Sequence, residues 1–179
     1  MDASQVEHAS PRPTNGESEQ LSIPAFVYPY RVGISGGILG GLAMVIVAFI
    51  YGVVSGRGIW LPVNLIGATL ARELQNEPLE VLTQFNPAAL VAGLLLHAVV
   101  SVGIGFVFAM LLPTMPGPPI VWTLTVGSLL WVLASLLILP ILNPTMAEHV
   151  DVPSFLVAHL VYGIVLGVWI PRTPKIPVR

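Results

Sequence analysis

The sequence predicts an all-α integral membrane protein with four transmembrane helices, and three observations support this fold class. Hydrophobic residues make up 55% of the 179 residues and charged residues only 9%, whereas a soluble domain carries about 25% charged residues. The charges are also segregated, because none lies between Arg31 and Arg57, Glu80 and Glu148, or Asp151 and Arg172. Each apolar stretch is long enough for a helix to cross the hydrocarbon core, which takes about 20 residues.

The N-terminal segment differs from the rest of the chain. Residues 1–25 are polar, with Ser, Asn, Glu and Pro and no Phe, Trp or Tyr, so they bury too little apolar surface to offset the entropy of ordering. We expect a disordered cytoplasmic tail here. The segment lacks the basic region and short apolar core of a signal peptide, so the first helix is expected to act as an uncleaved anchor.

The membrane domain is predicted over residues 26–172, with spans at about 32–54, 88–112, 120–142 and 153–170. The second and third spans are separated by the proline-rich segment 113–119, because proline lacks an N–H and clashes with the preceding helical turn. The Asn143-Pro144 pair predicts the turn after the third span. Residues 173–179 are predicted to form a second cytoplasmic tail.

The segment between the first two spans predicts a short amphipathic helix at about 62–75, lying in the outer interface. Its apolar residues Val63, Ile66, Leu70 and Leu74 recur at helical spacing. Polar residues lie off this stripe, namely Asn64, Arg72, Glu73 and Gln75. The helix is either a lid packed on the bundle or an element that docks a partner or gates a substrate.

The basic residues predict the orientation. With four spans both ends share a side, and that side carries more basic residues (Arg12, Arg31, Arg172, Lys175 and Arg179) than the other (Arg57 and Arg72). Because basic loops stay in the cytoplasm, we expect a multi-pass protein of a bacterial-type inner (cell) membrane with cytoplasmic N- and C-termini.

Two similarities suggest an internal duplication into two helical hairpins. Leu61-Pro-Val-Asn64 follows the first span and Leu139-Pro-Ile-Leu-Asn143 ends the third. The second and fourth spans both read His, three residues, a small residue, three residues, Gly, as His97-Ser101-Gly105 and His159-Gly163-Gly167. True duplication and chance similarity in an apolar chain both remain open.

His97 and His159 are the two ionisable residues well inside the spans, and such residues usually face the bundle interior and have a function. They could form interhelical hydrogen bonds with Ser101, Tyr162, Asn64 or Asn143. They could instead be the axial iron ligands of a b-type haem, with Ser101, Gly105, Gly163 and Gly167 leaving room for the macrocycle. A proton- or substrate-handling site in a small transporter is the third alternative.

Other chemistry has little support in the sequence. Glu148, His149 and Asp151 could hold a divalent metal, but a solvated loop whose acids favour the next helix N-terminus is the preferred interpretation. The chain has no cysteine, no phosphate-binding glycine loop and no nucleophile elbow. Its net charge of −2 and the lack of a basic run argue against a nucleic-acid partner.

These observations predict a non-catalytic integral membrane subunit or accessory protein of a larger inner-membrane complex, a respiratory or other electron-transfer complex being one such class. Its expected partners are the lipid bilayer and other membrane subunits. The alternatives are a two-histidine haem protein that carries electrons through His97 and His159, with haem b as cofactor, and a small transporter or channel.

Overall fold

The chain is mostly helical in a computed structural model that describes residues 24–178. Four of the described helical segments are long and apolar enough to cross a membrane: Tyr30–Val54, Pro87–Thr114, Pro119–Leu142 and Val152–Arg172. These segments confirm the multi-pass helical architecture and begin and end within two residues of the predicted spans. Of the predicted tail at residues 1–25, residues 1–23 lie outside the described part.

The long helices are α1 (Tyr30–Val54), α4 (Pro87–Leu111), α5 (Pro119–Leu133) and α8 (Val152–Trp169). A 3-10 turn (Leu112–Thr114) extends α4, and another (Ile170–Arg172) extends α8. A π-helical turn at Ala134–Ile138 joins α5 to α6 (Leu139–Leu142), which completes the third span. Asn143 ends this span and caps α7 (Pro144–His149), as the Asn-Pro pair predicts.

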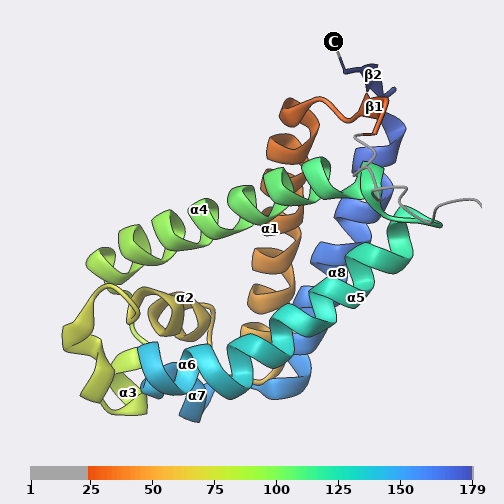
Figure 1. The fold of residues 1–179 in the computed structure, drawn as a ribbon. Coiled ribbons are helices and arrows are strands. Elements are labelled where there is room, and N and C mark those ends of the chain that lie inside the picture. Colours follow the sequence, from red (N-terminus) through yellow and green to blue (C-terminus); the bar gives the residue numbers. More distant parts are fainter. Residues whose placement is uncertain (1–23, 179) are drawn as a thin grey trace, which may run out of the picture.

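The long helices pack in the order α4, α1, α8, α5. Helix α1 packs against both α4 and α8, and α8 also packs against α5. Helices α4 and α5 approach each other at their short connection and diverge toward the opposite end (Figure 1). The arrangement is therefore an open row of helices whose two outer members splay apart.

Short helical segments fill the wide end of this row, and we refer to them together as the cap. The cap consists of α2 (Trp60–Gly67), the 3-10 turn Arg72–Asn76, α3 (Leu79–Leu82), α6 and α7. Figure 1 shows these segments gathered between the diverging ends of α4 and α5. The single helix expected at 62–75 is thus an eight-residue helix followed by separate short turns.

The buried face of α2 differs from the predicted apolar stripe. Leu61, Asn64 and Leu65 are buried, whereas Leu70 is 51% exposed. Asn64 is predicted on the polar face but is fully buried; its Nδ2 donates to the backbone carbonyls of Leu82 and Gln84, and its Oδ1 has no partner within the described residues. A polar side chain that satisfies buried carbonyls can lie on the packed face.

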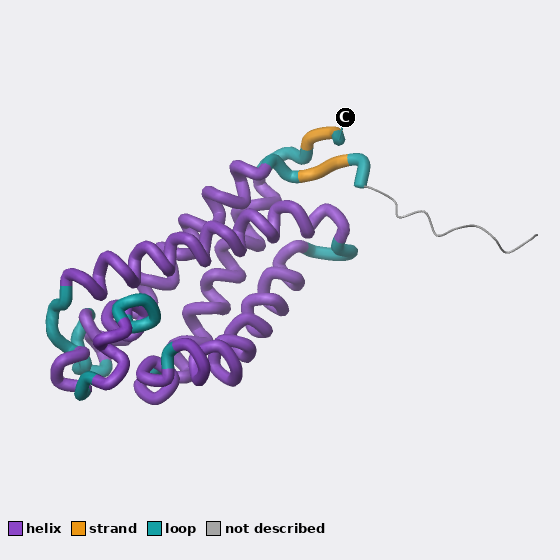
Figure 2. Tube along the Cα trace, turned by 60° about the vertical axis from the view of Figure 1, so that its left-hand side comes forward, coloured by secondary structure: helices purple, strands orange, loops and turns teal. Residues whose placement is uncertain are grey.

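The two ends of the helical row lie together. Strand β1 (Phe26–Val27) precedes α1 and pairs antiparallel with β2 (Ile176–Pro177), which follows α8. Figure 2 shows both strands beyond the ends of the long helices. The segment predicted as a C-terminal tail at 173–179 therefore includes a strand that ties the two ends together.

Both helical hairpins are packed through small residues. In the first, a Cβ built on Gly37 would lie 2.5 Å from Ser101 O, and one on Gly33 would lie 2.6 Å from Gly105 O. In the second, a Cβ on Gly127 would lie 2.9 Å from His159 O. Small residues let helix backbones approach closely in lipid, where little hydrophobic drive acts between helices.

Candidate functional site

One group of polar side chains inside the spans lies between two separate apolar clusters. One cluster, at the cap, includes Leu61, Leu65 and Leu139, and the other, toward the termini, includes Phe108, Tyr162 and Leu166. We define the polar layer as His97, Ser101, Trp131, Ser135 and His159, which lie between these clusters along the helices. This layer is the candidate site.

His97 makes a hydrogen bond between helices. Its Nε2 lies 2.9 Å from the carbonyl oxygen of Gly41 on α1. Gly41 has no side chain to cover this carbonyl, and a Cβ there would lie 2.9 Å from Ser101 Oγ and 3.4 Å from His97 Nε2. The interhelical bond expected for His97 is therefore present, but its partner is a glycine carbonyl on α1.

His159 makes its bond within its own helix. Its Nδ1 lies 2.8 Å from the carbonyl oxygen of Phe155, and its ring meets the Phe155 ring edge-on with centroids 4.5 Å apart. The interhelical bond expected for His159 is replaced by this local contact, because the Phe155 carbonyl lies one turn back on the same face of α8.

A hydrogen bond across α1 fixes the relative height of the two histidines. Tyr162 on α8 donates its hydroxyl to Ser101 O on α4 at 2.5 Å. The Tyr162 ring passes over Gly40 of α1, where a Cβ would lie 2.7 Å from its Cδ2 atom. His97 precedes Ser101 by four residues and His159 precedes Tyr162 by three, so each histidine lies about one helical turn closer to the cap. Both histidines thus lie at a similar depth along their helices.

The third span adds two polar atoms without partners. Trp131 Nε1 and Ser135 Oγ are buried and make no hydrogen bond within the described residues. Ser135 lies in the π-helical turn, a feature that is frequent at functional sites. Neither residue is among the predicted site residues, although two polar side chains one turn apart in an apolar span indicate such a position.

The small residues assigned to a haem pocket are in contact with neighbouring helices. A Cβ on Gly105 would lie 2.7 Å from the backbone of Gly37, and one on Gly163 would lie 2.7 Å from Thr123 O. Gly167 is similarly covered by Ile120 and Thr123. Neighbouring helices therefore fill the space beside these glycines that the haem hypothesis assigned to the macrocycle. A Soret band that disappears in His97→Ala or His159→Ala would reveal a haem.

No group of three or more His, Asp or Glu side chains in residues 24–178 is arranged to hold a metal ion, so the metal alternative at Glu148, His149 and Asp151 gains no support. Asp151 instead caps α8, because its Oδ2 accepts from Ser154 N at 2.8 Å. A carboxylate in this position compensates free N–H groups at the start of a helix.

The cap contains a second polar network, which sequence analysis did not predict. The amide of Asn143 donates to Leu65 O at 2.6 Å and to Thr69 Oγ1 at 2.8 Å. Its Oδ1 accepts from Met146 N at 2.9 Å and from the side chain of Gln75 at 3.2 Å. Because these bonds join α2 to the turn between α6 and α7, the network holds the two halves of the cap together.

The chemistry available in the polar layer is hydrogen bonding by hydroxyl, indole and imidazole groups. The described carboxylates all lie at the cap end, at Glu73, Glu77, Glu80, Glu148 and Asp151. Comparisons of the chain with family models, with curated proteins and with solved structures found no match.

Proposed function

We propose that this chain is a non-catalytic integral membrane subunit or accessory protein of a larger inner-membrane assembly. The observation that carries the proposal is the exposure of the third span. Only 11% of its most apolar stretch is buried, against 33% in the fourth span. Among the long helices, α5 packs mainly along α8, and Thr123 and Gly127 are its buried residues.

The balance of features supports a structural role. Glycine contacts join α1 to α4, and small residues join α5 to α8, while the intramembrane histidines bond to backbone carbonyls. Such contacts stabilise helix association. The exposed side chains of the third span, such as Leu129 at 60% and Leu136 at 76%, provide an apolar face of the kind that another transmembrane helix can cover.

The proposal includes an orientation in which the termini are cytoplasmic and the cap lies at the outer interface. Arg31, Arg172 and Lys175 lie at the end with the two strands, where the described residues include no carboxylate. This asymmetry supports the orientation because basic residues are retained on the cytoplasmic side. The kind of assembly, such as an electron-transfer complex, stays a prediction of the sequence.

We also propose that the two helical hairpins, α1 with α4 and α5 with α8, arose by duplication. In both, the helix that carries the histidine packs its small residues against the preceding long helix. The Leu-Pro-Asn similarity does not support duplication, because Pro62 lies inside α2 whereas Pro140 lies in α6 at the end of a span.

Site-specific photo-cross-linking in native membranes tests the proposal. A photoreactive residue at Leu129 on α5 is compared with one at Ile46 on α1, because the two side chains are 60% and 59% exposed. We expect Leu129 to cross-link to a distinct membrane protein that also co-purifies in mild detergent, and Ile46 to react mainly with lipid. Isolation as a lone monomer, or cross-links only between copies of this chain, would contradict the proposal.

A further inference from the structure

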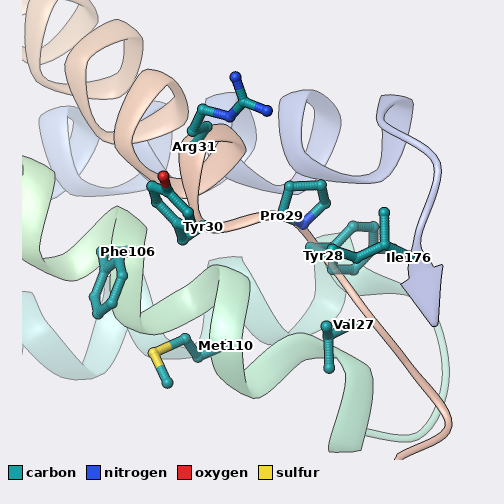
Figure 3. A pocket seen from close by; sticks show the side chains of 8 residues that line it. All are labelled: Val27, Tyr28, Pro29, Tyr30, Arg31, Phe106, Met110 and Ile176. Atoms are coloured by element: carbon teal, nitrogen blue, oxygen red, sulfur yellow. The ribbon is translucent and has the colours of Figure 1, made fainter. Parts of the chain in front are cut away.

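A shallow pocket opens beside the start of α1, at the end that carries the two strands. It has a volume of about 430 Å³ and is lined by the segment 27–31, by Phe106 and Met110 of α4, and by Ile176 of β2 (Figure 3). The pocket lies where a span begins, so it is expected at the level of the lipid headgroups. This position differs from that of the polar layer, which lies inside the spans.

The part of the pocket on α4 is apolar. Phe106 and Met110 are 37% and 57% exposed and lie one helical turn apart. Beside them, α1 and α4 are in close contact, since a Cβ on Gly33 would lie 2.7 Å from Ala109 Cβ. Such an exposed apolar strip beside a closed helix contact can receive a hydrocarbon chain.

The other part of the pocket is basic and aromatic. Arg31 lines it, is exposed, and has no hydrogen-bond or ion-pair partner within residues 24–178. Lys175 Nζ lies 5.2 Å from the centroid of the Tyr28 ring, which also lines the pocket. The pairing of β1 with β2 brings Tyr28 and Lys175 together, and Arg31 follows Tyr28 by three residues at the start of α1. Arg31 therefore lines the pocket and Lys175 lies against one of its lining residues, at an end of the protein where the described residues include no carboxylate.

We propose that this pocket binds an anionic phospholipid, with its phosphate at Arg31 and Lys175 and one acyl chain along Phe106 and Met110. The guanidinium group matches phosphate geometry and is more weakly hydrated than an ammonium, and basic residues at the membrane surface attract anionic lipids. The apolar strip can contact the acyl chain of a phospholipid, whereas a free phosphate has no apolar group to place there. This inference does not depend on the proposed subunit role.

The test is lipid binding to the purified, delipidated full chain in a non-ionic detergent, measured by native mass spectrometry. Phosphatidylglycerol and phosphatidylcholine with identical acyl chains serve as probes, with glycerol phosphate as the soluble headgroup control. Arg31→Gln is compared with Arg57→Gln, which changes an exposed arginine at the cap end that contacts the carbonyl oxygen of His149.

We expect phosphatidylglycerol to bind more tightly than phosphatidylcholine, and Arg31→Gln to weaken phosphatidylglycerol binding by about fivefold. Arg57→Gln should leave it unchanged. Met110→Trp, which fills the apolar strip, should weaken the binding of both lipids. Equal binding of the two lipids, equal effects of the two arginine variants, or equally tight binding of glycerol phosphate would overturn the proposal. If Arg31→Gln does not fold, the comparison of the two lipids and the Lys175→Gln variant test the proposal instead. Lys175→Gln should also weaken the binding of phosphatidylglycerol.

Discussion

The close contact between α1 and α4 predicts that alanine substitutions at two glycines of α4 differ in their effect on stability. A Cβ on Gly105 would lie 2.7 Å from both N and Cα of Gly37, which are backbone atoms. Carbon atoms pack at about 3.5–4.0 Å, so Gly105→Ala must push α4 away from α1 by about 1 Å. A Cβ on Gly103 meets no heavy atom of another segment within 4 Å, so Gly103→Ala is the matched control.

The two substitutions share the same gain in helix propensity, at most about 1 kcal/mol, so the difference between them isolates the cost of overpacking. That cost is about 1–3 kcal/mol. We expect Gly105→Ala to have a lower free energy of unfolding than Gly103→Ala by this amount. Unfolding by SDS titration in mixed micelles, followed by the fluorescence of the native tryptophans, measures the difference. Equal stability of the two variants would refute the close packing of α1 on α4.

Three further substitutions test individual hydrogen bonds by the same unfolding assay. Asn143→Leu leaves buried partners such as Leu65 O unpaired, so we expect the free energy of unfolding to fall by about 3 kcal/mol. A decrease smaller than about 1 kcal/mol, the usual cost of removing a helix N-cap residue, would contradict the network. Asp151→Ala removes the N-terminal capping residue of α8 and should lower the free energy of unfolding by about 1 kcal/mol. An unchanged free energy of unfolding would show that this capping hydrogen bond is not formed. Tyr162→Phe removes the bond to Ser101 O and should cost about 0.6 kcal/mol; wild-type stability would mean that another group takes its place.

The spans were predictable because membrane insertion depends on local composition. The gap in charge between Arg31 and Arg57 is filled by a single helix, and the cluster at 113–119 interrupts the longest gap where expected. Proline and charge act on the residues nearest to them. These signals therefore predict where a helix begins and ends without any knowledge of its neighbours.

The order of the helices and the contacts of the polar residues were not predictable in the same way. His97 bonds to Gly41 because a glycine on another helix leaves its carbonyl uncovered, and periodicity along one helix does not indicate which neighbour lies opposite. Asn64 was expected on the outer face of its helix, yet it satisfies carbonyls near α3. Its place depends on a contact between segments that are 18 and 20 residues apart.

The most direct test of the architecture is the sidedness of introduced cysteines, since the chain has none of its own. Single cysteines replace Ala25 and Pro174 at the end with the strands, and Glu77 and Glu148 at the cap; all four residues are exposed. In sealed cells, a membrane-impermeant thiol reagent should label both cap positions and neither terminal position until the membrane is opened. Labelling of positions 25 and 174 from opposite sides would contradict the four-span fold.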